Sequence, residues 1–247
     1  YPTVVMVSTV KRKVQVIDSS WSTPQLLDAL LAALKGDGPA LATAPIDTDE
    51  VDPKVALIVT TSGSTGNPKS VLLSAQSLLA NARATHKYIG ASAGQRWSLL
   101  LPTSHIAGLN ILIRSIELGT QPVTVESNAD FSAIVPTQLH RALTSDSQLL
   151  AHLKKCQSVL VGGGPLDAEL RQRAIDAGIK VTTTYGMTET VTHIALKKLN
   201  HFLPSAGLES LASFYQLLPN VSIYKDTRNC LVIDAPKVAK EIIFTND

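Results

Sequence analysis

Short apolar runs alternate with stretches of helical spacing along most of the chain, and this alternation predicts the secondary structure. A continuous apolar run, typical of a strand buried on both faces, occurs at 55–59. Further short runs predict strands at 71–73, 97–101, 123–125, 133–135, 158–161 and 180–184. Capped amphipathic stretches predict helices at 75–89, 106–118, 136–156 (with a break near Ser145) and 166–177. The repeated order of strand and helix predicts an α/β fold with mostly parallel sheets flanked by helices.

The first 53 residues carry a weaker pattern. Apolar runs at 4–7 and 14–17 predict two short strands. Thr23-Pro24 opens a helix that stops before Gly36, because proline suits the first helical position and glycine the residue after the end. The stretch 37–53 is rich in Asp, Pro, Thr and Ala, and we expect a loop there.

The pattern of apolar and polar residues changes after about residue 200. Apolar runs at 221–224 and 230–233 flank a polar turn, which predicts a hairpin, and 241–244 predicts a last strand. We therefore expect two parts: an α/β region over residues 1–200 and a small β subdomain over 201–247.

Composition and charge exclude several classes of protein. The 247 residues are 45% hydrophobic and 17% charged, which argues against disorder, and a net charge of +2 is too small for a nucleic-acid surface. No apolar run reaches the roughly 18–20 residues of a membrane span, so we expect a soluble protein. Cys156 and Cys230 have neither a disulfide framework nor metal-ligand spacing, which fits a reducing, cytoplasmic location. The chain opens at Tyr1 without Met or a signal peptide, and we expect both of its ends to be truncated.

The strongest chemical signal is the loop over residues 60–70, Thr-Thr-Ser-Gly-Ser-Thr-Gly-Asn-Pro-Lys-Ser, which follows a predicted buried strand. Its hydroxyls and its glycines allow donors to approach an oligophosphate closely, and Lys69 adds a positive charge. The alternative is a surface linker, although linkers do not usually follow a core strand.

A second alternative for this loop is the Walker A loop of P-loop NTPases, G-x-x-x-x-G-K-[ST]. Residues 63–70 match it except at Pro68, which stands in place of the second glycine, and 231–234 could serve as a Walker B strand. Proline has no N–H to offer a phosphate, and 71–74 continues as a strand where a Walker loop opens a helix.

Three further segments follow predicted strands. In Tyr185-Gly186-Met187-Thr188-Glu189-Thr190 the Tyr can stack on a base, the Thr can bond a phosphate, and Glu189 can hold Mg²⁺; the alternative is a helix-capping segment. The turn at 162–164 is Gly-Gly-Gly, which lets a flat ring lie against the backbone; the alternative is a tight turn. His105 stands at the end of a strand, where open α/β sheets place ligands, and its alternative is a structural role.

Taken together and in this order, the four segments resemble the adenylate-forming (AMP-binding) superfamily of acyl-CoA synthetases, over about residues 50–247. Three stretches, 105–109, 135–139 and 185–195, are most similar to the 2-succinylbenzoate–CoA ligases of menaquinone synthesis. The sequence departs from the family at Ser70, which replaces a glycine. The family's Thr-Gly-Asp motif is here Thr245-Asn246-Asp247. The family's hinge and lysine-bearing C-terminal domain would follow this motif, so we expect these 247 residues to be the large N-terminal domain without them.

The resemblance implies a two-step ligase that uses ATP and Mg²⁺ to activate a small carboxylic acid, with 2-succinylbenzoate the expected acid, and then transfers the acyl group to coenzyme A. The implied contacts to the β- and γ-phosphates are Thr61, Ser62, Gly63, Ser64, Thr65, Gly66 and Lys69. The implied contacts to the rest of the nucleotide are Gly162, Gly163, Gly164, Tyr185 and Gly186 at adenine, Thr188 at the α-phosphate, and Asp247 at the ribose. Glu189 is the implied Mg²⁺ ligand, and His105 would line or gate the acyl pocket.

By this resemblance the catalytic residues are Lys69, His105, Thr188 and Glu189. Other functions stay open at this point: an aromatic or fatty acyl-CoA synthetase, a P-loop NTPase, or a non-catalytic nucleotide-binding fragment. No nucleic-acid partner is expected, and a homo-oligomer is compatible with the sequence.

Overall fold

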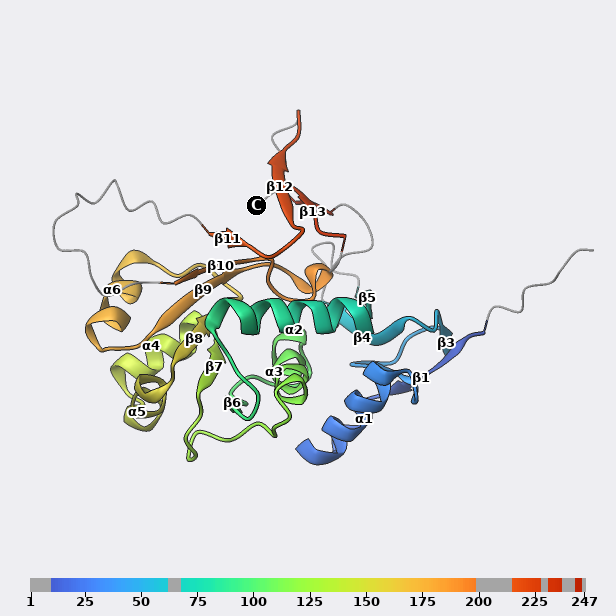
Figure 1. Cartoon of the computed structure of the whole chain (residues 1–247), viewed down its shortest axis with the longest axis horizontal. Helices are drawn as coiled ribbons and strands as arrows, with labels where there is room; N and C mark the ends of the chain where they lie inside the picture. The colour runs from blue at the N-terminus through green and yellow to red at the C-terminus, as the bar shows by residue number, and fades with distance from the viewer. Residues whose placement is uncertain (1–9, 62–67, 199–214, 228–230, 237–242, 246–247) are drawn as a thin grey trace, which may run out of the picture. The chain divides into compact units, whose positions relative to one another are not determined.

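The computed structural model describes residues 10–61, 68–198, 215–227, 231–236 and 243–245. The chain divides into two compact units, Tyr1–Ala75 and Gln76–Asp247, and each is described by itself (Figure 1). Within the described ranges, no helix has both the length and the apolar character needed to cross a membrane. The strand predicted at 4–7 lies outside the described residues.

The first unit is a mixed five-stranded sheet of order β3-β1-β2-β4-β5 with one helix. Its strands β1, β2 and β4 are parallel, and β3 and β5 pair antiparallel at the two edges. The bounds are β1 Arg12–Val16, α1 Thr23–Lys35, β2 Ala40–Ala42, β3 Glu50–Val51, β4 Val55–Thr61 and β5 Lys69–Ser74. The buried Arg12 guanidinium joins these elements by donating to the carbonyls of Ala33, Gly38 and Val55.

Helix α1 forms as its local sequence predicts. Ser22 and Gln25 make a reciprocal capping box, Pro24 stands in the first turn, and Gly36 ends the helix with φ +86°.

The loop predicted over 37–53 is wrong in part, because β2 and β3 lie within it. The three residues of β2 are fully buried between β1 and β4, with Leu41 opposite Leu57. Such a short run of small residues has no period of its own, so its pairing with distant segments makes it a strand.

The second unit contains a six-stranded sheet of order β11-β10-β9-β8-β7-β6. The strands from β6 to β9 are mutually parallel, and β10 and β11 add antiparallel pairs. The strand bounds are β6 Trp97–Ser98, β7 Phe131–Ile134, β8 Ser158–Val161, β9 Val181–Tyr185, β10 Ala195–Lys198 and β11 Gln216–Leu217. The helix bounds are α2 Ala75–Ile89, α3 Ile106–Glu117, α4 Pro136–Thr144, α5 Ser147–Lys155 and α6 Ala168–Asp176.

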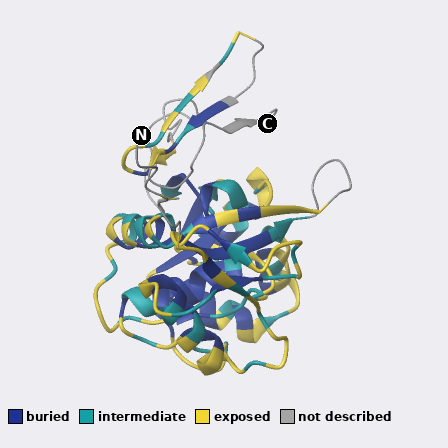
Figure 2. Cartoon of the chain, turned by 90° about the vertical axis from the view of Figure 1, so that its right-hand side faces the viewer, coloured by how far each residue is buried: buried dark blue, intermediate teal, exposed yellow. Residues whose placement is uncertain are grey.

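Both faces of this sheet are covered, as the repeated order of strand and helix predicts. Ile134, Val159 and Val161 pack against residues of α4, α5 and α6 on one face. Residues one position away, Ala133 and Leu160, belong to the cluster on the other face, which includes residues of α2 and α3. Figure 2 shows the buried residues gathered along the strands, with exposed residues on outer helical turns and loops.

Two strand predictions in this unit are too long. β6 ends at Ser98, and the strand expected at 123–125 is a single bridge between Ser98 and Val123. The chain leaves the ladder after Leu99 donates to the Val123 carbonyl, so Leu100 and Leu101 are apolar for packing rather than for pairing. The predicted helix break near Ser145 is confirmed, with Asp146 capping α5 through the Leu149 N–H.

A separate three-stranded antiparallel sheet confirms the predicted hairpin and last strand. Its order is β12-β13-β14, with bounds Ser222–Lys225, Leu231–Asp234 and Ile243–Thr245. The domain boundary at 200/201 stays a prediction, since residues 199–214 lie outside the described part of the chain.

Candidate active site

A cavity of about 210 Å³ opens at the carboxyl ends of three neighbouring parallel strands. Its walls include Val135 after β7, Gly162 and Gly163 after β8, and Gly186 after β9, while Ile106 and Ala107 come from the start of α3. Most of the lining is apolar. Its polar side chains are those of Arg114, Thr184, Thr188, Thr192 and His193. Ligands of open α/β sheets bind at this end of the strands, so the cavity is the candidate site.

The glycines at the cavity are required by close packing. A Cβ on Gly162 would collide with the Thr184 side chain, and a Cβ on Gly186 would collide with the Thr192 carbonyl and the His193 Cα. Gly163 has φ +77°, a conformation that favours glycine. Gly164 differs, because its Cβ would meet only Pro136 Cγ at 3.9 Å, and Gly164 is not among the cavity-lining residues.

The segment after β9 forms one turn of 3-10 helix, η1 Thr188–Thr190. Gly186, Met187 and Thr188 line the cavity, and Glu189 is half-buried beside them. Thr190 is buried and closes the turn, since its hydroxyl donates to the Met187 carbonyl and accepts from the Met187 N–H. The structure therefore brings Gly162, Gly163, Gly186 and Thr188 to one cavity.

Arg114 is a site residue that the sequence analysis missed. Its side chain is buried at 2% exposure, its guanidinium lies 5.1 Å from the Trp97 ring centroid, and Nη2 donates to the Thr192 hydroxyl at 3.5 Å. Within the described ranges, Nε has no hydrogen-bond partner and the guanidinium makes no ion pair. Burial lowers the pKa of Arg114 to about 9, so it stays a cation at neutral pH. An arginine inside the apolar helix 106–117 was the available signal.

Two neutral histidines flank this cation. Burial, and secondarily the charge of Arg114, lowers the pKa of His86 to about 4 and holds the pKa of His193 well below 6.5. The His86 Nε2 accepts from the Trp97 indole N–H at 3.2 Å. The Thr85 hydroxyl donates to the Asn81 carbonyl, so His193 Nε2, 2.8 Å away, is the donor to Thr85. Of Arg114, His86 and His193, only Arg114 is therefore charged at neutral pH.

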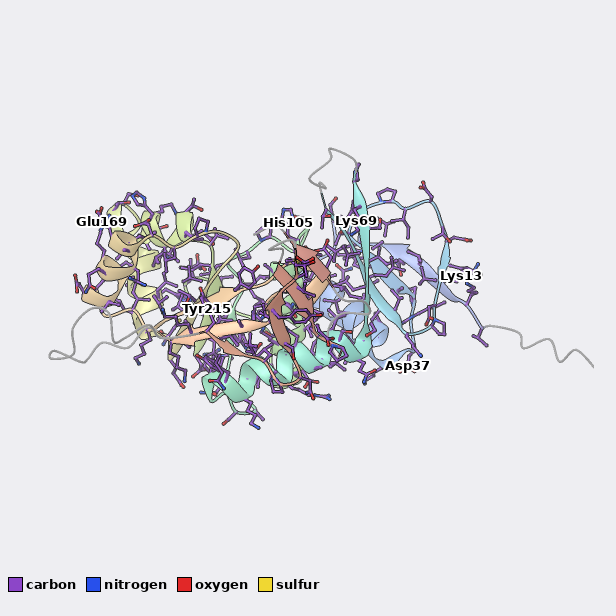
Figure 3. The ribbon with its side chains drawn as sticks, turned by 90° about the horizontal axis from the view of Figure 1, so that it is seen from above. Lys13, Asp37, Lys69, His105, Glu169 and Tyr215 are labelled. Atoms are coloured by element: carbon purple, nitrogen blue, oxygen red, sulfur yellow. The ribbon has the colours of Figure 1, made fainter. Side chains whose placement is uncertain are left out.

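His105 lies next to the cavity without lining it. It is the exposed residue preceding α3, and its side chain makes no capping hydrogen bond (Figure 3). Its neighbours Ile106 and Ala107 do line the cavity. A Cβ on Gly108 would collide with the Pro102 carbonyl, so this glycine lets α3 start close to the preceding loop.

In the first unit, Lys69 is exposed at the start of β5, and Thr61 stands opposite it at the end of β4 (Figure 3). Because an antiparallel strand follows the lysine where a P-loop has a helix, the Walker A alternative is wrong. The predicted phosphate contacts Ser62, Gly63, Ser64, Thr65 and Gly66, and the predicted ribose contact Asp247, lie outside the described residues.

The fold is that of the adenylate-forming enzymes, and the AMP-binding enzyme family matches residues 4–229, so the chain belongs to this family. A probable 2-succinylbenzoate–CoA ligase from Mycobacterium tuberculosis is 38% identical over 197 residues, covering 68% of this chain and 51% of that protein. The chain therefore spans about half the length of this relative.

Two solved structures share the fold. An acyl-CoA synthetase (AMP-forming)/AMP-acid ligase II-like protein from Dyadobacter fermentans is 33% identical with a TM-score of 0.63, covering 77% of this chain and 55% of that one. O-succinylbenzoate coenzyme A synthetase from Bacillus subtilis, in complex with ATP and magnesium ion, is 22% identical with a TM-score of 0.61, covering 92% and 56%. The predicted α/β fold class is confirmed.

Proposed function

We propose that this chain is the nucleotide- and acid-binding part of an ATP-dependent acid–CoA ligase, and that its acid is 2-succinylbenzoate. The observation that carries the proposal is Arg114: a buried cation, with no ion pair in the described residues, in the wall of an otherwise largely apolar cavity. Family membership and the similarity to a probable 2-succinylbenzoate–CoA ligase support the same reaction.

The cavity favours an aromatic dicarboxylate. 2-Succinylbenzoate has a ring and two carboxylates, so one carboxylate can neutralise Arg114 while the other reacts with ATP. A fatty acid has one carboxylate, and its activation would leave the buried guanidinium uncompensated. The cavity volume, about 210 Å³, is below the roughly 300–1,000 Å³ of pockets that hold a whole drug-sized ligand. It therefore suits the acyl part, with the nucleotide outside it.

For the nucleotide, the proposed contacts are those that the family resemblance implies. Gly162, Gly163 and Gly186 present backbone where a Cβ would be strained or would collide, which fits the approach of a flat ring, with Gly164 and Tyr185 beside them. Thr188 would bond the α-phosphate. Thr61, Lys69 and the residues between them would hold the β- and γ-phosphates, and Asp247 the ribose.

Glu189 would hold Mg²⁺ together with the phosphates. Among the described residues no group of three His, Cys, Asp or Glu could bind a metal by itself, and Mg²⁺ typically takes one or two carboxylates plus substrate phosphates. A single carboxylate beside the α-phosphate contact fits this pattern. The ion supplies charge neutralisation on the phosphates.

The proposed reaction has two steps. A carboxylate oxygen attacks the α-phosphorus of ATP, and the bond to the leaving pyrophosphate breaks. The thiol sulfur of coenzyme A then attacks the acyl carbon, AMP leaves, and the thiol proton passes to solvent. Lys69 and Thr188 would stabilise the charge that builds on the phosphates, because attack by one anion on another needs positive charge and donors. His105 would line the entrance for the acid.

A pyrophosphate-release screen of the whole protein against aromatic and aliphatic carboxylates tests the proposal. We expect release with 2-succinylbenzoate and much less with benzoate or with a fatty acid of similar length. Equal release with the monocarboxylates would contradict the assignment of Arg114. Binding of AMP without pyrophosphate release for any acid would instead support a non-catalytic nucleotide-binding protein.

A further inference from the structure

The turn that follows η1 contains a strained residue. Val191 has φ 73° and ψ −51°, and its side chain is fully buried. This conformation is rare for any residue with a Cβ and rarest for a β-branched one. Strained residues persist where surrounding structure holds them, and they cluster at functional sites. Val191 stands between Thr188 and Thr192, both of which line the cavity.

Two buried asparagines from separate helices hold this turn. Asn110 of α3 donates from Nδ2 to the Val191 carbonyl and to the Thr192 hydroxyl, both at 3.3 Å. Asn81 of α2 donates from Nδ2 to the His193 carbonyl at 2.7 Å, and its Oδ1 accepts from the Thr192 hydroxyl at 3.2 Å. Both side chains are fully buried. The carbonyls on either side of Thr192 are thus each bonded to a helix.

The orientation of both amides follows from these carbonyls. A flipped amide would place its oxygen against a carbonyl oxygen, so each NH₂ group must face the turn. Among the described residues the Oδ1 of Asn110 has no hydrogen-bond partner. A buried, unpaired amide oxygen is costly, and an apolar side chain would avoid that cost. The presence of asparagine at this buried position is therefore explained by its donor end, which bonds the turn.

The turn is tied directly to the residues proposed to bind the phosphates and the metal. The Val191 N–H donates to the Thr188 carbonyl at 2.9 Å, and the Thr190 hydroxyl, which donates to the Met187 carbonyl, lies 3.3 Å from the Thr192 carbonyl. The Ile194 N–H donates to the Tyr185 carbonyl. A shift at Val191 would therefore move η1, with Thr188 and Glu189 on it.

We propose that Asn81 and Asn110 are positioning residues, which hold the strained turn at Val191 so that Thr188 and Glu189 stay in place for Mg²⁺ and the α-phosphate. The inference rests on the proposed function of those two residues. It assigns no contact between either asparagine and the substrates.

The test is Asn110→Ala in the whole protein, with pyrophosphate release measured against Mg²⁺ concentration. We expect the half-saturating Mg²⁺ concentration to rise by about tenfold, the lower end for loss of an outer partner of a metal ligand. Amide hydrogen exchange at Val191 and Ile194 should also become faster, which is a readout independent of activity.

Two variants on the same helix serve as matched controls. Ser115 is buried with no described hydrogen-bond partner for its hydroxyl, so Ser115→Ala should change neither readout. Leu112 is buried in the core, so Leu112→Ala should lower the melting temperature and leave the Mg²⁺ dependence unchanged. An equal rise in the Mg²⁺ requirement for Leu112→Ala would show that Asn110 acts only through stability and would overturn the proposal.

The remaining outcomes separate this inference from the proposed function. A normal Mg²⁺ dependence in Asn110→Ala, with a raised one in Glu189→Gln, overturns the positioning role alone. No pyrophosphate release by the unaltered protein overturns the function. If Asn110→Ala does not fold, hydrogen exchange can be measured on the unaltered protein instead. Exchange at Val191 and Ile194 as fast as in exposed loops would then overturn the proposal.

Discussion

The turns after β8 and β9 differ from the described end of the β4–β5 hairpin in how closely they are packed. After β8 and β9, Gly162 and Gly186 are packed so closely that a Cβ would collide with Thr184 or with the 192–193 backbone. At the β4–β5 end, Lys69 and Ser70 are exposed on an edge strand. Changes at the cavity glycines Gly162 and Gly186 should affect folding and binding together, while a change at Lys69 should affect chemistry alone.

Arg114→Met should produce the largest effect, and it should separate binding from folding. Loss of the buried cation should weaken binding of 2-succinylbenzoate by about 10³-fold, or about 4 kcal/mol, because the acid loses its buried partner. The free energy of unfolding should stay the same or rise, since an unpaired buried charge is removed. Calorimetry and urea denaturation measure the two quantities.

The matched control for Arg114 is Arg83→Met, which removes an exposed arginine paired with Glu117. A surface pair contributes about 0–1 kcal/mol to stability, and acid binding should not change. If Arg114→Met bound the acid as tightly as the unaltered protein, the cavity would not be a dicarboxylate site.

Lys69→Ala, a change in the β4–β5 hairpin, should give the next largest effect. The rate of adenylate formation should fall by at least about 10²-fold, or about 3 kcal/mol, because the leaving pyrophosphate loses a charged donor. The melting temperature should not change, since the side chain is exposed. Lys54→Ala, an exposed lysine before β4, is the control and should leave the rate unaltered. A normal rate in Lys69→Ala would remove the phosphate role.

Gly186→Ala should destabilise the second unit by roughly 1–3 kcal/mol, because the new Cβ meets backbone that cannot move away cheaply. Gly164→Ala is its control and should change stability by less than about 0.5–1 kcal/mol, since the added methyl group has room. Urea denaturation of both variants measures the difference. Equal stabilities would mean that the contact between Gly186 and the 192–193 backbone is not tight in solution.

Acid should destabilise the second unit selectively, because all six histidines follow residue 75. His86 takes up a proton near pH 6.5 when unfolded but only near its pKa of about 4 when folded, so protons favour unfolding between these values. This residue alone should cost about 2 kcal/mol at pH 5, with His193 adding in the same direction. His86→Gln should reduce the acid-induced loss measured by denaturation at pH 7 and pH 5. An unchanged pH dependence in this variant would show that His86 is not held neutral by burial.

Several elements could be predicted because their signals are local. The capping box of Ser22 and Gln25 and the left-handed Gly36 act within one helical turn of their own backbone. The segment 185–190 is ambiguous alone and becomes recognisable together with the loop 60–70, because the two follow predicted strands in the order that the family has. β2 could not be predicted, since three small residues become a strand only between β1 and β4.

The sequence by itself determined the helices and most of the central strands, the family and the chemistry of the motif residues, because these depend on neighbours a few positions away. The tertiary structure alone decided that Arg114, Thr192 and His193 share a cavity with Gly162 and Gly186. It also decided that Asn81 and Asn110, 112 and 81 positions from their carbonyl partners, hold the turn at Val191. Such contacts depend on which distant segments pack together, and burial then sets the charge state of each group, as it does for His193 beside Arg114.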